Sequence, residues 1–100
     1  VEEEKSIKLD DLSNYDRKSK ILIVNNQKVY LTKYEIIFMD FLSEEKGKIY
    51  KNEEIANYYN SLGESIDITN IRKLVSKLRK KLPNQSIESI YSIGYRIAIS

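Results

Sequence analysis

The first thirty residues alternate between apolar and polar positions, which is the pattern of short β-strands. Ile7 and Leu9 have polar neighbours, and a run of mostly β-branched residues follows at 21–24. β-Branched and aromatic residues interrupted by Asn, Asp and Ser are typical of antiparallel strands joined by tight turns. Asn25-Asn26 marks one such turn. We therefore expect strands near residues 6–10, 12–16, 20–24 and 28–31.

At Thr32 the apolar spacing changes to that of a helix. Thr32 and Glu35 have the spacing of a capping box, in which each side chain accepts a hydrogen bond from the other residue's backbone amide. Gly47 lies just past the expected end, where a helix can stop in a left-handed turn. The apolar positions of this first helix are Tyr34, Ile37, Phe38, Phe41 and Leu42.

A second helix is expected to begin at Lys51 or Asn52, after a short strand at Ile49-Tyr50. Glu53 and Glu54 would lie in its first turn, where the helix dipole favours acidic side chains. Its apolar side would contain Ile55, Tyr58 and Tyr59. Residues 61–65 contain Gly63 and are expected to form a loop.

The third predicted helix covers about residues 67–82, with Ser65 or Asp67 as its cap and Pro83 just beyond its end. At 100° per residue, one side is an apolar stripe that should face the core. That stripe consists of Ile68, Ile71, Val75, Leu78 and Leu82. The opposite face carries Thr69, Lys73, Ser76, Lys77 and Lys80, and it is flanked by Asn70, Arg72, Leu74, Arg79 and Lys81.

The C-terminal stretch, residues 86–100, alternates again on both sides of Gly94, which predicts a β-hairpin. The order of elements is therefore strands, three helices and a hairpin. A chain of 100 residues with this order is expected to form one α+β domain over residues 1–100.

Charge is concentrated in the third helix. The whole chain has a formal charge of +2, but Ile68 to Leu82 contains six basic and no acidic residues, so the other 85 residues sum to −4. A merely solvated face usually mixes signs, for example with Glu and Lys four residues apart. Lysine and arginine beside small hydrogen-bonding residues are the groups that bind DNA phosphates and base edges. The helix is therefore a candidate DNA-binding element, and a solvated polar face is the alternative.

Composition excludes several other functions. The chain has no cysteine and no histidine, which removes disulfides, ordinary zinc sites and the usual catalytic triads. We find no paired carboxylates and no phosphate-binding loop, so we expect no enzyme activity, no metal and no cofactor. The sequence contains no apolar run long enough to span a membrane and no signal-peptide pattern. A cytoplasmic protein is expected.

Four motifs in order resemble the OmpR/PhoB-type winged-helix DNA-binding domain of bacterial response regulators. They are the Leu-Thr-x-x-Glu helix start at 31–35, Gly-Lys-Ile-Tyr at 47–50, Val-Ser-Lys-Leu-Arg-Lys-Lys-Leu at 75–82, and Ile-Tyr-Ser-Ile-Gly-Tyr-Arg at 90–96. The resemblance covers nearly the whole chain. It implies a four-stranded N-terminal sheet over 1–31, three helices with a helix-turn-helix over 32–82, and a wing hairpin over 86–100.

The resemblance also implies a function and partners. The chain would be the sequence-specific output domain of a two-component transcription regulator, without the receiver domain that normally precedes it. Helix 67–82 would lie in the major groove of double-stranded DNA, and the wing would reach toward the adjacent minor groove. Two copies would bind promoter direct repeats or pair through the receiver domain, and loop 60–66 would contact RNA polymerase.

The candidate DNA contacts combine the helix face with the wing. The family usually has Arg-Gly where this chain has Tyr91-Ser92, and its residues differ at Arg72, Lys73 and Leu74, so the operator is not inherited from a relative. Arg79 is open to a phosphate contact or to a salt bridge with a carboxylate of the first or second helix. The full set of candidates is Thr69, Asn70, Arg72, Lys73, Leu74, Ser76, Lys77, Arg79, Lys80, Tyr91, Ser92 and Arg96.

A second hypothesis belongs to another class of function. A winged helix can also bind a protein, and the basic helix with Leu74 beside it would suit an acidic, partly apolar partner. Sequence preference in DNA binding distinguishes the two hypotheses. A protein-interaction module would show no preference among DNA sequences.

Overall fold

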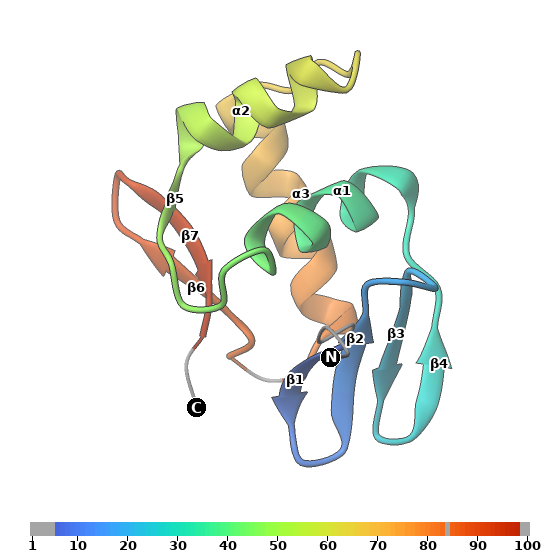
Figure 1. Cartoon of the computed structure of the whole chain (residues 1–100). Helices are drawn as coiled ribbons and strands as arrows, with labels where there is room; N and C mark the ends of the chain where they lie inside the picture. The colour runs from blue at the N-terminus through green and yellow to red at the C-terminus, as the bar shows by residue number, and fades with distance from the viewer. Residues whose placement is uncertain (1–5, 84, 99–100) are drawn as a thin grey trace.

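The computed structural model describes residues 6–83 and 85–98, and its elements follow the predicted order (Figure 1). The outermost parts of the predicted sheet and hairpin, residues 1–5 and 99–100, lie outside the described residues. Figure 1 shows helix α3 in the middle of the molecule, with a four-stranded sheet near its C-terminal end and a hairpin along its side.

The N-terminal sheet consists of four antiparallel strands in sequence order, β1-β2-β3-β4. Asn25 and Asn26 both have positive φ angles, 52° and 66°. This is the geometry of a primed two-residue turn, whose twist matches that of the strands it joins. The strands are β1 (Ser6–Asp10), β2 (Ser13–Asp16), β3 (Ile21–Val24) and β4 (Gln27–Val29).

Helix α1 (Lys33–Leu42) begins at the predicted capping box. The Glu35 amide donates to Thr32 Oγ1 at 3.3 Å, and the Thr32 amide donates to Glu35 Oε1 at 2.9 Å. The helix ends earlier than the position of Gly47 suggested. The Ser43 amide still bonds to Met39 O, but the Ser43 hydroxyl bonds to Asp40 O, and Gly47 lies in the following turn with a φ of 90°.

Strand β5 (Tyr50–Lys51) leads directly into helix α2 (Asn52–Ser61). The Lys51 amide is satisfied by Glu54 Oε1 at 2.9 Å, which fixes the start of α2. Helix α3 (Ile68–Lys81) begins where the side chain of Asp67 accepts the Asn70 amide at 2.8 Å. It ends at Leu82, whose extended backbone is the conformation favoured before a proline.

The C-terminal hairpin, called the wing from here on, pairs β6 (Ile87–Ile90) with β7 (Gly94–Ile97). Strand β7 also pairs with β5, giving a three-stranded sheet in the order β5-β7-β6. Gly94 permits this arrangement, because a Cβ atom there would collide with the backbone carbonyl of Tyr50. The wing is therefore attached to the segment that precedes α2.

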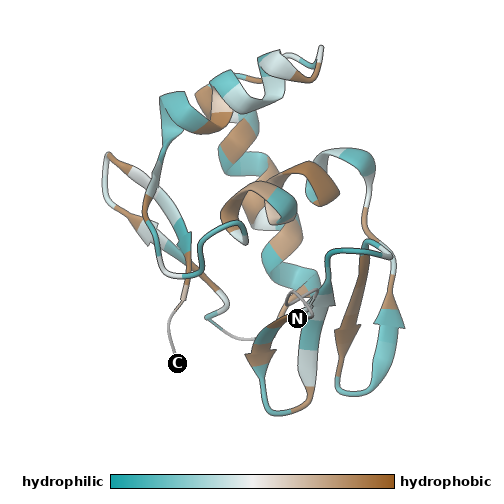
Figure 2. Cartoon of the chain, in the orientation of Figure 1, coloured by the Kyte–Doolittle hydropathy of each residue, from teal (hydrophilic) through white to brown (hydrophobic). Residues whose placement is uncertain are grey.

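One hydrophobic core joins the helices to both sheets, and α1 carries much of its apolar surface (Figure 2). Helix α1 contacts α2, α3 and β7, so it connects the other two helices to the wing. The fully buried side chains include Tyr15 and Leu22 from the N-terminal sheet and Phe38, Met39, Leu42, Ile55, Tyr59, Ile71 and Leu78 from the helices.

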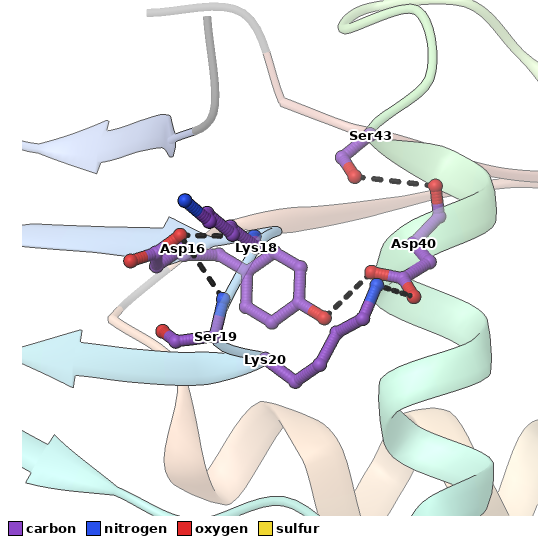
Figure 3. A network of polar contacts seen from close by, with 7 residues as sticks. Asp16, Lys18, Ser19, Lys20, Asp40 and Ser43 are labelled. Carbon is purple, nitrogen blue, oxygen red and sulfur yellow. Dashed lines mark hydrogen bonds and ion pairs between the residues drawn. The ribbon is translucent and has the colours of Figure 1, made fainter.

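A polar contact fastens the N-terminal sheet to α1 (Figure 3). The Tyr15 hydroxyl donates to Asp40 Oδ1 at 2.7 Å, and Lys20 Nζ lies 2.7 Å from Asp40 Oδ2. Burial and the hydrogen bond to Asp40 raise the pKa of the Tyr15 hydroxyl, so it remains a proton donor at neutral pH. These two contacts fix the position of the N-terminal sheet relative to α1.

Candidate nucleic-acid interface

Four cations project from one exposed face of α3. Arg72, Lys73, Lys77 and Lys80 are exposed, and none has an ion-pair or side-chain hydrogen-bond partner among the residues that the structure describes. The opposite side of the helix is held by Ile71, Val75 and Leu78 in the core. The four residues, called the cationic face from here on, therefore form a fixed row of positive charge.

Small polar side chains accompany the cationic face. Thr69, Asn70 and Ser76 are all exposed, and their side chains have no hydrogen-bond partner within residues 6–83 and 85–98. The backbone amide of Asn70 donates to the helix cap Asp67, whereas its side-chain amide remains available to a ligand. Hydroxyl and amide groups in this position can donate to phosphates or to base edges.

Arg79 points toward the wing, and a salt bridge to α1 or α2 is not found for it. Its guanidinium Nη2 donates to Ile87 O at 3.1 Å and to Ser89 Oγ at 2.6 Å. Both acceptors belong to β6, so Arg79 connects α3 to the wing. The side chain serves as a brace between the two elements and is only partly available to a phosphate.

The salt bridge to α1 is made by Lys81 instead. Lys81 Nζ lies 2.7 Å from Glu35 Oε1, and the Glu35 side chain is only 3% exposed. Burial disfavours the charged carboxylate, but the hydrogen bonds from Lys81 and Thr32 outweigh it and hold the pKa of Glu35 below its usual range. Two of the six cations of the basic segment, Arg79 and Lys81, are thus committed to structure.

Two apolar residues of α3 differ from their predicted positions. We expected Leu74 beside the DNA-facing side, but it is only 9% exposed and belongs to the core. Periodicity also places Ile68 in the core stripe, but it is 50% exposed. Ile68 is the first residue of the helix, directly after the cap residue Asp67, whereas Leu74 belongs to the hydrophobic core cluster.

The wing has no uncommitted cation among its described residues. Arg96 Nε donates to Glu88 Oε1 at 2.6 Å, across a directly opposed pair of residues on β6 and β7. Tyr91 is 94% exposed at the tip, and Ser92 has a φ of 60° in the left-handed region that favours glycine. Of the predicted wing contacts, Tyr91 and Ser92 are accessible and Arg96 is paired.

A groove of about 680 Å³ separates α3 from the wing. Arg72, Ser76 and Arg79 line it on the helix side, and Tyr91 and Ser92 line it on the wing side. The arrangement brings the candidate residues of the helix and of the wing tip to one continuous surface. Basic and hydroxyl groups around such a groove can receive a phosphate backbone.

A second groove, of about 860 Å³, lies between the starts of α2 and α3 and the wing tip. Ala56, Ile68 and Ile93 give it apolar walls, and Lys51 and Asp67 lie beside them. The sequence patterns did not predict this groove. Ile68 follows the cap residue Asp67 directly, and the apolar spacing of the sequence carried no signal that this isoleucine lies outside the core.

An exposed cationic helix beside a β-hairpin defines a winged-helix domain, and comparison with known proteins identifies its family. Residues 26–97 match the family model described as "Transcriptional regulatory protein, C terminal". The chain belongs to this family, the winged-helix DNA-binding output domains of OmpR/PhoB-type response regulators. The family consists of transcription-factor domains and not of enzymes.

Individual relatives agree with this assignment. The transcriptional regulatory protein KdpE of Staphylococcus aureus is 32% identical over 71 residues, which cover 71% of this chain and 31% of KdpE. The transcriptional regulatory protein SpaR of Bacillus subtilis is 28% identical over 81 residues, which cover 78% of this chain and 37% of SpaR. The chain thus spans about a third of the length of these relatives.

A solved structure confirms the fold. The DNA-binding domain of RstA from Klebsiella pneumoniae, crystallised in complex with the RstA box, superposes with a TM-score of 0.77. The match covers 95% of this chain and 98% of that domain at 20% sequence identity. The predicted α+β winged-helix architecture is therefore confirmed. Within the described residues, no helix is both long and apolar enough to cross a membrane.

Proposed function

We propose that this chain binds double-stranded DNA sequence-selectively, with α3 in the major groove. The observation that carries the proposal is the cationic face, which has no carboxylate partner among the described residues on a helix anchored by its opposite side. The major groove of B-DNA is about 12 Å wide and admits an α-helix. The major groove of A-form RNA is deep and narrow, which favours DNA as the partner.

The residues of the interface would make different kinds of contact with the DNA. Lys73 and Lys77 lie near the middle of the exposed face and would contact bases, while Arg72 and Lys80 would contact phosphates on either side. Thr69, Asn70 and Ser76 would add hydrogen bonds to bases or phosphates. Leu74 would support the helix from the core, and Arg79 and Arg96 would hold the wing in position.

The relatives are longer than this chain, and the remaining proposals concern partners of such a longer protein. We propose that two copies occupy direct repeats, arranged by contacts between the domains or through a receiver domain. We also propose that loop 60–66 contacts RNA polymerase, because Leu62 is exposed there while Glu64 fastens the loop to Lys33 and Tyr34 of α1. A cytoplasmic location would follow from this function.

The first experiment is a binding selection from a randomised duplex pool at near-physiological salt. Enrichment of a half-site repeated at about one helical turn would support a regulator that binds as a tandem pair. Retention of DNA without sequence enrichment would contradict sequence-selective binding. It would favour the alternative, a module that uses the basic helix to bind an acidic protein.

A double substitution tests the position of α3 on the DNA. We expect Lys73→Ala with Lys77→Ala to weaken binding to the selected duplex by about 1–3 kcal/mol for each hydrogen-bonded base that the variant no longer reaches. The measurement is a titration of labelled duplex at fixed salt. The matched control is Lys18→Ala with Lys28→Ala, which removes the same charge from exposed lysines of the N-terminal sheet region.

The comparison separates a specific interface from general attraction. Equal weakening by both double variants would mean that only net charge matters. Wild-type affinity in the Lys73 and Lys77 variant would show that α3 does not face the DNA.

A further inference from the structure

Three exposed side chains of α3 lie in one row along the helix. Asn70, Lys73 and Lys77 follow one another at intervals of three and four residues, so at 100° per residue they lie within about 60° of one another. At 1.5 Å per residue the row is about 10 Å long, which corresponds to about three base-pair steps of B-DNA. These three residues, called the central row from here on, could therefore contact about four successive base pairs.

Other polar residues of α3 are directed to the wing or to α1, which leaves base contacts mainly to the central row. Arg72 and Ser76 line the groove on the wing side, which can receive a phosphate backbone. Arg79 donates to β6, and Lys81 is paired with Glu35 of α1. The central row lies on the side of the helix that these contacts do not use.

The two lysines of the central row offer hydrogen-bond donors only. An ammonium group has three N–H donors and no acceptor. In the major groove guanine presents two adjacent acceptors, N7 and O6, whereas adenine presents one acceptor beside a donor and cytosine presents a donor. Within the described residues, no carboxylate is paired with Lys73 or Lys77, and α3 itself contains no acidic residue that could accept from cytosine. Guanine is therefore the base that each lysine can bind with two hydrogen bonds.

Asn70 adds a side chain that can both donate and accept. Its backbone amide donates to Asp67 Oδ1 at 2.8 Å, which fixes the residue in the first turn of α3. The side-chain amide matches the N6 donor and the N7 acceptor of adenine. Leu74, in contrast, is only 9% exposed in the core, so it cannot contact the methyl group of a thymine. The chemistry of this face therefore favours purines.

We propose that the half-site recognised by this chain contains two guanines, bound by Lys73 and Lys77, and an adenine bound by Asn70. The three purines, on either strand, lie within about four base pairs. The inference rests on the proposed DNA-binding function and deepens it, because it names the bases that α3 recognises. Replacing either guanine by another base should weaken binding about fivefold to a hundredfold, the usual cost of a lost two-bond contact.

The test compares base analogues within the half-site selected from the randomised duplex pool. 7-Deazaguanine lacks the N7 acceptor and keeps Watson–Crick pairing, whereas inosine lacks only the amino group in the minor groove. We expect 7-deazaguanine at either guanine position to weaken binding about tenfold, the cost of one hydrogen bond to a charged group. Inosine is the matched control, because it keeps N7 and O6, and it should leave the affinity unchanged.

Protein variants assign each lysine to its base. Lys73→Met removes the ammonium group, so this variant should bind guanine and 7-deazaguanine equally well at one position and still distinguish them at the other. Lys77→Met should show the reverse. Lys80→Met is the control, because it removes the same charge from the cationic face and should weaken binding to all duplexes alike. Asn70→Ala should relax the choice of base at the adenine position.

Failure of this inference and failure of the proposed function give different results. A randomised pool that yields no enriched half-site contradicts the proposed function, and the inference fails with it. An enriched half-site without guanine, or one in which 7-deazaguanine binds as well as guanine, overturns the inference and leaves the proposed function standing. The inference is also overturned if the Lys73 and Lys77 variants distinguish the two bases as wild type does, because other residues then bind the guanines.

Discussion

Glu35 is a buried carboxylate whose ionisation stabilises the fold. Its Oε1 accepts from the Thr32 amide and from Lys81 Nζ, and these bonds lower the pKa of Glu35 below the ordinary value of 4.5 despite its burial. A carboxyl with a lowered pKa in the folded state contributes stability above the pKa of the unfolded chain. This contribution is lost as pH falls through the folded-state pKa.

The Lys81→Met variant tests this pair. We expect the free energy of unfolding at pH 7 to fall by about 1–3 kcal/mol, because a buried carboxylate loses its charged partner. The difference from wild type should shrink as pH falls below about 4.5, and it should disappear once pH falls below the lowered folded-state pKa of Glu35, where the carboxyl is protonated in both proteins. The measurement is denaturant unfolding at a series of pH values.

The neighbouring lysine provides the control for this prediction. Lys80→Met removes the same charge from an exposed position of α3 and should change stability by less than about 0.5 kcal/mol. A Lys81 variant that is as stable as the Lys80 variant at pH 7 would contradict a structural role for the ion pair.

Two positions on α3 show that helix periodicity alone does not decide which apolar side chains are buried. Leu74 and Ile68 both lie about 60° from Ile71, on opposite sides of it, so periodicity alone puts them equally near the core. The structure buries Leu74 in the core and leaves Ile68 half-exposed, where it lines the groove between the starts of α2 and α3 and the wing tip. The commitment of Lys81 to Glu35 depends on packing between distant elements, which a single sequence does not contain.

At the scale of the element, the wing depends on a close approach between strands. Gly94 lies in β7 opposite Lys51 of β5, and its missing Cβ makes room for the Tyr50 carbonyl. A methyl side chain at position 94 would push β5 and the start of α2 away from the wing. The groove beside α3 would change shape as a result.

We therefore expect Gly94→Ala to lower the free energy of unfolding by about 1–3 kcal/mol or more, the usual cost of overpacking. The matched control is Gly63→Ala, where a Cβ would meet open space and only the φ of 79° is unfavourable. That control should cost about 1 kcal/mol. Thermal or denaturant unfolding measures both, and equal effects would contradict a steric role for Gly94.

Element order and type could be predicted because local patterns agree with the final fold. The capping box at Thr32 and Glu35 and the turn at Asn25-Asn26 are both found where the sequence suggested them. The pairing of Glu88 with Arg96 was also within reach, since a turn at residues 91–93 places these two residues opposite each other. The predicted contacts on DNA remain predictions, because they depend on a partner that lies outside the chain.

At the scale of the whole molecule, the excess of positive charge among the described residues lies on the cationic face. Two of the six cations in the basic segment are used by Glu35 and by the wing, and Arg96 is used by Glu88. The cationic face therefore carries most of the attraction to DNA. Charges elsewhere in the described residues largely balance, which orients the domain with α3 toward the duplex.

This charge arrangement predicts the salt dependence of binding. If the four residues of the cationic face each displace a counterion, the slope of log K against log salt should be about −3.6 for one bound domain. The measurement is a titration of a duplex with one half-site at several salt concentrations. A slope steeper than about −5 would mean that cations outside α3, such as Lys48 or Lys51, also reach the backbone.

The carboxylate oxygen shared by α1 and α3 also has a consequence for motion. Glu35 Oε1 accepts from the Thr32 amide at the start of α1 and from the side-chain Nζ of Lys81 at the end of α3. The two helix ends then cannot fray independently, because releasing either one leaves the same buried oxygen short of a partner. Amide hydrogens at these two ends, more than forty positions apart in the chain, would exchange with solvent as one cooperative unit.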